Sequence, residues 1–408
     1  MRLLPALLIA AALAVAARAQ PADPFAAPPG LDAATGAVGL SDSARVSLLT
    51  MLPGREVYSL WGHNAIRIAD PAAGIDRAYN YGTFDASQPH FVLRFLSGRL
   101  NYLLDTAPFE YELRRYAAMG RPIVEQTLDL PPDAVRELYD LLETNALPQN
   151  RDYRYDFLRD NCSTRLLDVL DDALAETGRP RVALPPTDTT STFRDDVRRY
   201  MVGDPLVDVG TALGLGLPMD RVPTRREAVF LPLALADALD GATVDGRPLV
   251  ASRDTLLWID GAGLPSPALP WPTAVSWALL AIGLGGALVG GRLPAGLRRL
   301  GRLADAGLFA AAGFAGTVLL LLWTATDHYV TEANVELLWL WPTHLAFAVP
   351  LLRAELSRGW RRYAVAAAAV SLFSVIVWMI APEPVHPATL PLALLLAVRA
   401  GGRARGKA

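Results

Sequence analysis

Apolar residues gather in long uninterrupted runs in the last third of the chain. Five such runs follow Trp271, covering roughly residues 273–291, 304–323, 337–352, 363–381 and 387–399. The first, second and fourth are long enough to cross a bilayer, which requires about 20 apolar residues. The third carries Pro342 and Pro350, which a membrane helix tolerates, and the fifth is short. The pattern predicts a transmembrane bundle of about five helices over residues 271–400.

The charges between these runs alternate. Arginine collects in the loop 292–303, in RAELSRGWRR and in the tail, whereas TDHYVTEANVE and PEPVHPA contain neither lysine nor arginine. The positive-inside rule places the basic segments in the cytoplasm. Five crossings then put the tail, residues 401–408, in the cytoplasm. The region before Trp271 is then expected outside the cytoplasm, which in a bacterial inner-membrane protein is the periplasm.

The first residues carry the pattern of an export signal. Residues 1–19 start with a single arginine, continue with a short apolar run and end in Ala17-Arg18-Ala19, the small-residue pattern of a cleavage site. An uncleaved N-terminal anchor is the alternative. Residues 20–38, rich in proline, alanine and glycine, indicate a flexible leader. The remaining residues, 39–262, are therefore predicted to form a periplasmic domain.

Strand and helix patterns are mixed within residues 39–262. Strands are predicted in EVYSLWGHNAIRIAD, DRAYNYGTFD, RLNYLLDTA and RPIVEQTLDL. Helices are predicted in HFVLRFLSG, PFEYELRRYAAMG, PPDAVRELYDLLETNAL, FLPLALADALDG and the segment that follows Cys162. The rest of residues 180–260 is interpreted as loops and short helices. Because strands and helices do not alternate regularly, we expect an α+β domain.

Charge and histidine spacing exclude two classes of partner. The formal net charge is −3, and no basic stripe suggests a nucleic acid partner. No pair of histidines or of cysteine and histidine has the spacing of metal ligands, so we expect no metal site. The sequence also gives no sign of an organic cofactor.

Cys162 is the only cysteine in the chain. Asp160 and Asn161 form a good N-cap, and an apolar stripe at helical spacing follows: Leu166, Leu167, Leu170 and Leu174. This places Cys162 in the first turn of a helix, where the dipole favours a thiolate nucleophile. A buried cysteine that packs as a small hydrophobe is the alternative. An unpaired thiol in an oxidising compartment, among polar neighbours, favours the nucleophile.

His63 is the best candidate for a base. It lies at the start of a predicted strand, where it shares one face with Ala65 and Arg67, while Asn64, Ile66 and Ile68 share the other. The remaining histidines lie in predicted loops or in a membrane segment: His90, His328, His386 and His344. A histidine that faces a helix N-terminus is the papain-like geometry, and its position before the cysteine is the circularly permuted order. A structural histidine is the alternative.

The third group, which would orient His63, is not identifiable from the sequence. Asn80, Tyr81 and Asp70 are all within range on the neighbouring strand or turn.

Several stretches together resemble the Lnb lipoprotein N-acyltransferase family. These are LLTMLPGREVYSLWGHNAIRIAD, YNYGTFD, EQTLDL, YRYDFLRDNCSTRLLDVL, the later FLP run and TDHYVTEANVELLWLWPTHL. The likeness covers roughly residues 40–350. In the last stretch the family usually has NLNLLW, whereas this chain has Glu336 at the third of these positions.

The resemblance implies a Cys–His acyltransferase that adds a third acyl chain to the N-terminal cysteine of diacylated lipoproteins. A membrane phospholipid would be the acyl donor, and Cys162 would carry the acyl group as a thioester with His63 as its base. We expect the Cys162 amide and Asn161 to stabilise the oxyanion. Further candidates for contact with the substrate or the oxyanion are Arg165, Asn64, Tyr81 and Arg67. For Arg165, a salt bridge to Asp160 or Asp168 is the alternative.

Two other functions fit the same pattern. The first is a cysteine peptidase or amidase that acts on cell-wall peptides. The second is a membrane-tethered lipid-binding module with an inert thiol and no enzymatic activity. The peptidase would need a water-accessible cleft, and a lipid groove beside Cys162 lined by leucine, phenylalanine and tryptophan would argue against it.

Overall fold

The computed structural model describes residues 39–186, 190–261, 263–380 and 385–406, and it divides into two compact units. The first unit contains the described residues up to Phe193 together with Val222–Leu264. The second contains Arg194–Arg221 and the residues from Pro265 onwards. The predicted signal peptide and leader, residues 1–38, lie outside the described residues.

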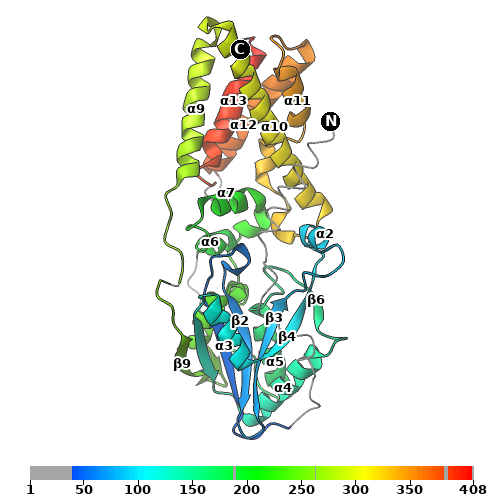
Figure 1. Ribbon diagram of the computed structural model, residues 1–408, viewed down its shortest axis with the longest axis vertical. Coiled ribbons are helices and arrows are strands. Elements are labelled where there is room, and N and C mark those ends of the chain that lie inside the picture. Colours follow the sequence, from blue (N-terminus) through cyan, green and yellow to red (C-terminus); the bar gives the residue numbers. More distant parts are fainter. Residues whose placement is uncertain (1–38, 187–189, 262, 381–384, 407–408) are drawn as a thin grey trace. The chain divides into compact units, whose positions relative to one another are not determined.

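The first unit is built on an antiparallel sheet, which has seven strands within the described residues (Figure 1). Their spatial order is β6-β4-β3-β2-β1-β5-β9. The strands are β1 (Arg45–Met51), β2 (His63–Asp70), β3 (Ile75–Thr83), β4 (Asn101–Pro108), β5 (Ile123–Leu128), β6 (Asp152–Arg154) and β9 (Val250–Leu257). The strands β2 and β3 lie at the centre of this order, so residues at their ends are held by neighbours on both sides.

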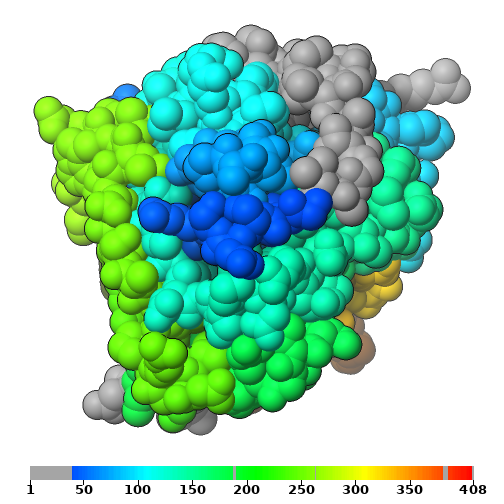
Figure 2. Space-filling model, turned by 90° about the horizontal axis from the view of Figure 1, so that it is seen from below, coloured from blue at the N-terminus to red at the C-terminus, as the bar shows by residue number. Residues whose placement is uncertain are grey.

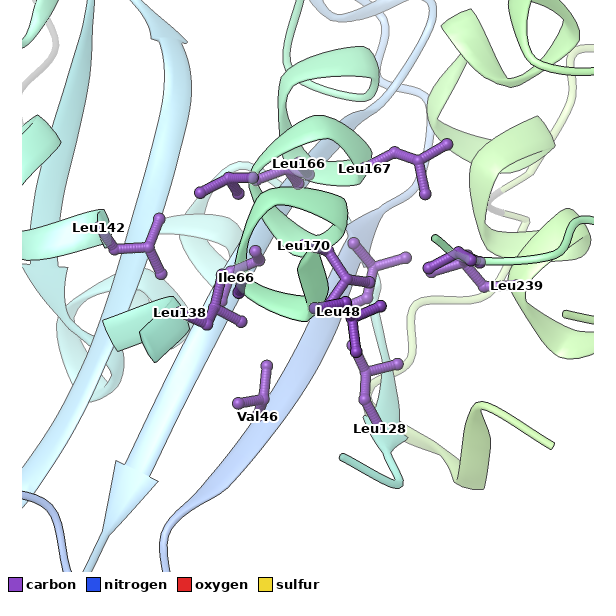
Figure 3. Packing of buried hydrophobic residues seen from close by; sticks show 14 of the residues in the cluster. Val46, Leu48, Ile66, Leu128, Leu138, Leu142, Leu166, Leu167, Leu170 and Leu239 are labelled. Atoms are coloured by element: carbon purple, nitrogen blue, oxygen red, sulfur yellow. The ribbon is translucent and has the colours of Figure 1, made fainter. Parts of the chain in front are cut away.

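Helices cover both faces of this sheet. On one face α4 (Pro132–Ala146), α5 (Thr164–Glu176) and α8 (Pro232–Asp240) enclose the main core, as Figure 3 shows. On the other face α3 (Phe109–Ala118) packs over a smaller cluster. Successive strand residues alternate between the two cores. Ile66 lies in the first and Ala65 in the second, which confirms the face assignment made from the sequence.

The beginning of the described chain is fixed to the turn between β2 and β3. Asp70 accepts hydrogen bonds from the backbone N–H of Ser41 at 2.6 Å and from its hydroxyl at 2.8 Å. Figure 2 shows this first segment, in dark blue, against the lighter blue of the turn. Asp70 is therefore a structural residue at the end of β2 opposite to His63.

Most predicted elements are present, with three differences. The predicted strand EVYSLWGHNAIRIAD is helical at Val57–Ser59 and becomes extended only at His63, because Gly62 adopts φ 83° between them. A Cβ at Gly62 would lie 2.8 Å from the Met51 carbonyl oxygen, so only glycine fits there. The strands β1 and β6 were not predicted. The expectation of loops and short helices over 180–260 was wrong at β9, which is mostly exposed and lacks an alternating pattern.

The second unit contains five helices from Trp271 onwards within the described residues. They are α9 (Trp271–Val289), α10 (Ala295–Ala325), α11 (His344–Leu351), α12 (Arg358–Ile380) and α13 (Thr389–Ala404). Within the described ranges, three segments are long and apolar enough to cross a membrane: 271–292, 295–325 and 358–379. The third predicted run divides into a 3-10 turn, Val335–Leu338, and the short α11. Five crossings remain a prediction.

A segment from the predicted periplasmic region groups with the membrane helices. It carries α7 (Pro205–Gly214), whose last carbonyl groups accept hydrogen bonds from the Asn334 side chain, the shortest being 2.7 Å to Leu213. His386 Nε2 also lies 3.1 Å from Asp208 on α7. Glu336, where the chain departs from the family pattern, is buried and bonds the indole N–H of Trp339.

Candidate active site

Cys162 lies two residues before Thr164, the first residue assigned to α5. The Arg165 N–H bonds the Asn161 carbonyl oxygen at 3.1 Å, so the helical hydrogen bonds start at Asn161. Asn161 caps this turn, as the sequence predicts. Its Oδ1 accepts hydrogen bonds from the backbone N–H groups of Ser163, at 2.7 Å, and Thr164, at 3.1 Å. The turn so formed leaves the Cys162 side chain partly exposed.

The rest of the Asn161 side chain is also engaged. Its Nδ2 donates to the carbonyl oxygens of Phe157, at 2.7 Å, and Phe230, at 3.0 Å. Because its side-chain donors and acceptor all bond backbone groups, Asn161 holds the conformation of the turn that contains Cys162. The oxyanion role predicted for Asn161 has no free side-chain donor to perform it.

His63 begins β2 and is held by Asn80 on β3. His63 Nε2 lies 3.2 Å from Asn80 Oδ1, and Asn80 Nδ2 lies 3.5 Å from Glu112 Oε1 on α3. Because an amide oxygen can only accept, Nε2 carries the proton and Nδ1 is the nitrogen able to act as a base. Of the three candidates for the orienting group, the structure brings Asn80 to His63. The Tyr81 hydroxyl instead accepts from Asn145 at 2.8 Å.

Asn64 joins the histidine to the cysteine. The backbone N–H of Asn64, the residue directly after His63, donates to the Cys162 sulfur. Its side-chain Oδ1 accepts from the Ser163 hydroxyl at 2.9 Å, and its Nδ2 donates to Thr50 at 2.9 Å. The start of β2 is thus fixed to the turn before α5. Asn64 acts on the sulfur through its backbone, since its side chain is buried and fully used.

Gly82 on β3 lies against Cys162. It adopts φ 90°, and a Cβ at this position would lie 3.5 Å from the Cys162 Cβ, an ordinary contact distance. Ordinary residues rarely take this backbone conformation, so glycine is favoured here by its backbone geometry.

Burial sets the protonation states of both groups. Burial raises the pKa of the Cys162 thiol, and the Asn64 N–H and the charge of Arg121 oppose this only in part. Burial and then the charge of Arg121 lower the pKa of His63 to about 3. The resting site therefore holds a thiol beside a neutral imidazole. Burial thus opposes the thiolate that the sequence predicts, because desolvation outweighs the local donors.

Arg121 is a functional candidate that the sequence analysis missed. It lies between α3 and β5 and is 7% exposed. Its Nε donates to the Leu52 carbonyl oxygen at 3.1 Å, one residue beyond Met51, which pairs with His63 across β1 and β2. Nothing in the spacing of Arg121 relative to the GHNA or DNCSTR motifs indicates this proximity, which depends on the β1–β5 pairing.

The other predicted arginines have structural partners. Arg165 pairs with Asp160, with Nη2 2.9 Å from Oδ2, and its guanidinium lies 3.7 Å above the Tyr153 ring. Arg67 bonds Asp76 and Glu125 on the strands and lies 3.6 Å from the Phe109 ring centroid. Arg165 is therefore one turn from Cys162 but already paired, and Arg67 is part of the α3 face of the sheet.

A strip of aromatic rings extends from the surface toward Cys162. Ring centroids follow each other at 6.3, 5.7, 5.4 and 4.4 Å through Phe95, Phe91, Phe84, Tyr102 and Tyr155. Tyr155 ends the strip 3.8 Å from the Cβ position of Gly82, which also contacts Cys162. At the other end lies α2 (Phe91–Leu96), whose Leu93, Phe95 and Leu96 are exposed. We call these five rings the aromatic strip.

Metal ligation has no support in the described part of the chain, where no group of three or more histidine, cysteine or acidic side chains could hold an ion.

Two family models match the chain. Residues 35–195 match the Lnb N-terminal periplasmic domain, and residues 266–405 match the Lnb transmembrane domain. The chain belongs to the Lnb family. The resemblance found in the sequence is thereby confirmed, and this Lnb protein is an inner-membrane protein with a periplasmic domain. The first match contains both Cys162 and His63. No curated protein and no solved structure matches the chain.

Proposed function

We propose that this Lnb protein is a Cys–His acyltransferase that moves an acyl chain from a membrane phospholipid to the N-terminal amine of diacylated lipoproteins. The observation that carries the proposal is the convergence of Cys162, His63 and Asn80 within the periplasmic domain. Cys162, the only thiol of the chain, accepts a hydrogen bond from the backbone N–H of Asn64, the residue after His63. The His63 imidazole is neutral and is oriented by Asn80.

The first half-reaction forms a thioester. The Cys162 sulfur attacks the carbonyl carbon of a phospholipid ester while His63 Nδ1 takes the thiol proton. The tetrahedral intermediate collapses with cleavage of the ester C–O bond. The imidazolium returns the proton to the departing alkoxide, which leaves as a lysophospholipid. The Cys162 backbone N–H, which also acts on the Cys162 sulfur, is a donor for the transient oxyanion.

The second half-reaction restores the thiol. The α-amine of the lipoprotein cysteine attacks the thioester carbonyl, and His63 accepts the amine proton. Cleavage of the C–S bond gives the N-acylated lipoprotein and a Cys162 thiolate, which regains a proton from the imidazolium. Since the resting pair is neutral, ionisation and attack are coupled within each half-reaction.

The aromatic strip favours a lipid substrate over a cell-wall peptide. Its five rings form a continuous series of apolar contacts from the exposed helix α2 to the neighbourhood of Cys162, and an apolar surface of this kind suits an acyl chain. The bilayer, which the second unit enters, would supply the donor and hold the acceptor. The proposal also includes two features predicted from the sequence, a circularly permuted papain-like fold and a cytoplasmic C-terminus.

Intact mass spectrometry of the full-length protein in phospholipid micelles tests the proposal. Wild type should gain one acyl mass, which Cys162→Ala lacks, and a diacylated lipopeptide with a free amine should remove it and become N-acylated. His63→Gln should form the adduct at least about 100-fold more slowly, the range typical for loss of a general base.

A lipopeptide with an acetylated N-terminus is the matched control and should leave the adduct in place. Release of the acyl group to water at the full rate without any amine would identify a hydrolase instead. Cleavage of cell-wall peptides that requires Cys162 would favour the peptidase. A wild-type protein that neither gains acyl mass nor cleaves such peptides would leave only the lipid-binding module.

A further inference from the structure

A positive charge is buried close to the thiol without a counter-charge. Among the described residues no carboxylate pairs with Arg121, and its Nη2 is buried with no hydrogen-bond partner. The other arginines near the site behave differently, since Arg165 pairs with Asp160 and Arg115 lies 3.6 Å from Glu112. A buried charge without a partner is costly, which makes an anionic partner strongly favourable at this position.

The position of the guanidinium relative to the site is fixed by three contacts. Nε is bonded to Leu52, the chain around Arg121 is held by the Tyr116 carbonyl, and the guanidinium lies 5.0 Å from the Tyr116 ring centroid. From there its charge lowers the pKa of both His63 and Cys162. A single cation therefore faces both members of the reacting pair.

A second buried donor lies near the same sulfur. The Tyr153 hydroxyl, in a residue that is 9% exposed, has no hydrogen-bond partner among the described residues. It lies 3.9 Å from the Cβ position of Gly82, and the Cys162 Cβ lies 3.5 Å from that same position. The charge of a Cys162 thiolate also acts on Tyr153. Two unsatisfied donors, one of them cationic, thus lie in the part of the domain that contains the nucleophile.

We propose that Arg121, assisted by the Tyr153 hydroxyl, forms an anion-binding site beside Cys162. Its ligand is a negatively charged oxygen, carried either by the phosphodiester of a lipid headgroup or by the carbonyl group during acyl transfer. The catalytic part of this inference rests on the proposed function. The binding part does not, because an anion can be recruited to Cys162 whether or not acyl transfer follows.

Alkylation of the only thiol measures the site directly. Iodoacetate carries a carboxylate and iodoacetamide does not, so the ratio of their rates at Cys162 reports the local potential independently of the intrinsic reactivity of the thiol. In the full-length protein, Arg121→Gln should lower the iodoacetate-to-iodoacetamide ratio about tenfold, the effect of one charge at several ångströms in a partly exposed site. Arg121→Lys should retain most of the wild-type ratio.

Arg114→Gln is the matched control. Arg114 lies on α3 as an exposed residue paired with Glu110, and its removal should leave the ratio unchanged. The thermal unfolding midpoint of each variant identifies any loss of fold. If the Gln variant unfolds, the wild-type ratio decides, because an anion site requires it to exceed the ratio measured on a free cysteine peptide. Equal ratios in wild type and Arg121→Gln, with both proteins folded, would overturn the anion site.

Two acyl donors separate the two sources of the charge. If the phosphodiester is the ligand, Arg121→Gln should slow adduct formation from phospholipid but not from a neutral p-nitrophenyl ester. If the oxyanion is the ligand, both donors should slow by a similar factor. Acylation by both donors at the wild-type rate would contradict a catalytic role of Arg121. A wild-type protein without any acyl adduct refutes the proposed function alone, since the alkylation ratio still decides the anion site.

Discussion

The site combines two neutral groups whose readiness to react depends on orientation. Cys162 and His63 do not form a thiolate–imidazolium ion pair before the substrate binds, because burial disfavours both charged forms. The competence of His63 as a base then depends on presenting Nδ1, and Asn80 fixes the ring for this purpose by accepting from Nε2.

Loss of Asn80 should therefore reduce turnover without abolishing acylation. Asn80→Ala releases the ring, and we expect kcat to fall about tenfold to 100-fold with little change in KM, as misplacement of a catalytic group by about 1 Å does. Steady-state N-acylation of a lipopeptide measures both constants. Asn145→Ala, which removes an amide on the opposite face of the sheet, should keep kcat within about twofold. An unchanged kcat in folded Asn80→Ala would contradict the orienting role.

The pH dependence should reflect the depressed pKa of His63. A free imidazole would be half protonated near its usual pKa of about 6.5 and would lose base function below it. In the folded site the pKa is about 3, so His63 stays neutral as the pH falls from 7 to 5 and is lost as a base only nearer pH 3. We expect kcat/KM to be flat from pH 7 to 5. A decline centred near 6.5 would indicate a solvated histidine.

At the scale of elements, the site lies where the ends of two central strands meet the turn before α5. His63 starts β2, Gly82 lies near the end of β3, and the Asn161 turn brings Cys162 between them. The aromatic strip extends this arrangement to α2, a six-residue helix with an exposed apolar side. The start of β2 thus carries His63, the end of β3 lies against Cys162, and the aromatic strip lies near the edge strand β6.

A charge on α2 should affect lipid donors selectively. Leu93 is 66% exposed, so Leu93→Glu should leave the unfolding midpoint nearly unchanged. We expect it to lower acyl transfer from phospholipid vesicles about tenfold, because the carboxylate has to approach apolar and anionic lipid, while a soluble p-nitrophenyl ester should react normally. Val222→Glu places the same charge at another exposed apolar position of the unit. Equal activity of both variants on vesicles would exclude a role for α2.

The sequence predicted what depends on local pattern and missed what depends on pairing. The helix after Cys162 and strands β2 to β5 have clear apolar spacing, and the two catalytic candidates lie in compact motifs. By contrast β9 is an exposed edge strand held by backbone bonds to β5, so its side chains carry no signal. Arg121 comes beside His63 only through the pairing of β1 with both β2 and β5. The thiol pKa was misjudged because burial cannot be read from neighbouring residue types.

In the molecule as a whole, part of the sequence between the two family matches belongs to the membrane unit. Asp208 on α7 lies 3.1 Å from His386 and 3.0 Å from the Arg198 Nε, a buried junction between α7 and the segment before α13. Asn334 adds a second junction, through hydrogen bonds from its Nδ2 to the carbonyl oxygens of Leu213 and Gly214 at the end of α7. The loops of the membrane unit that carry Asn334 and His386 are thus partly covered by residues 194–221.

Removal of the Asp208 carboxylate should loosen this junction. Asp208→Ala leaves both His386 and Arg198 without their acceptor. We expect the free energy of unfolding of the membrane unit to fall by about 2 kcal/mol, within the range for the loss of a buried polar partner. Limited proteolysis in detergent should then cut within residues 194–221 much faster than in wild type. Asp204→Ala, which removes only the cap of α7, is the milder control at about 1 kcal/mol. Identical cleavage of Asp208→Ala and wild type would contradict the junction.

The desolvation that raises the pKa of the half-buried Cys162 thiol also helps one unpaired cysteine to persist outside the cytoplasm. Peroxide and exchange with foreign disulfides both consume the thiolate, so a sulfur that ionises only during attack on its substrate offers little to either reagent. With no second cysteine in the chain, a sulfenic acid could not be rescued by an internal disulfide. Resistance to oxidation at rest is therefore the only protection that the protein itself can provide.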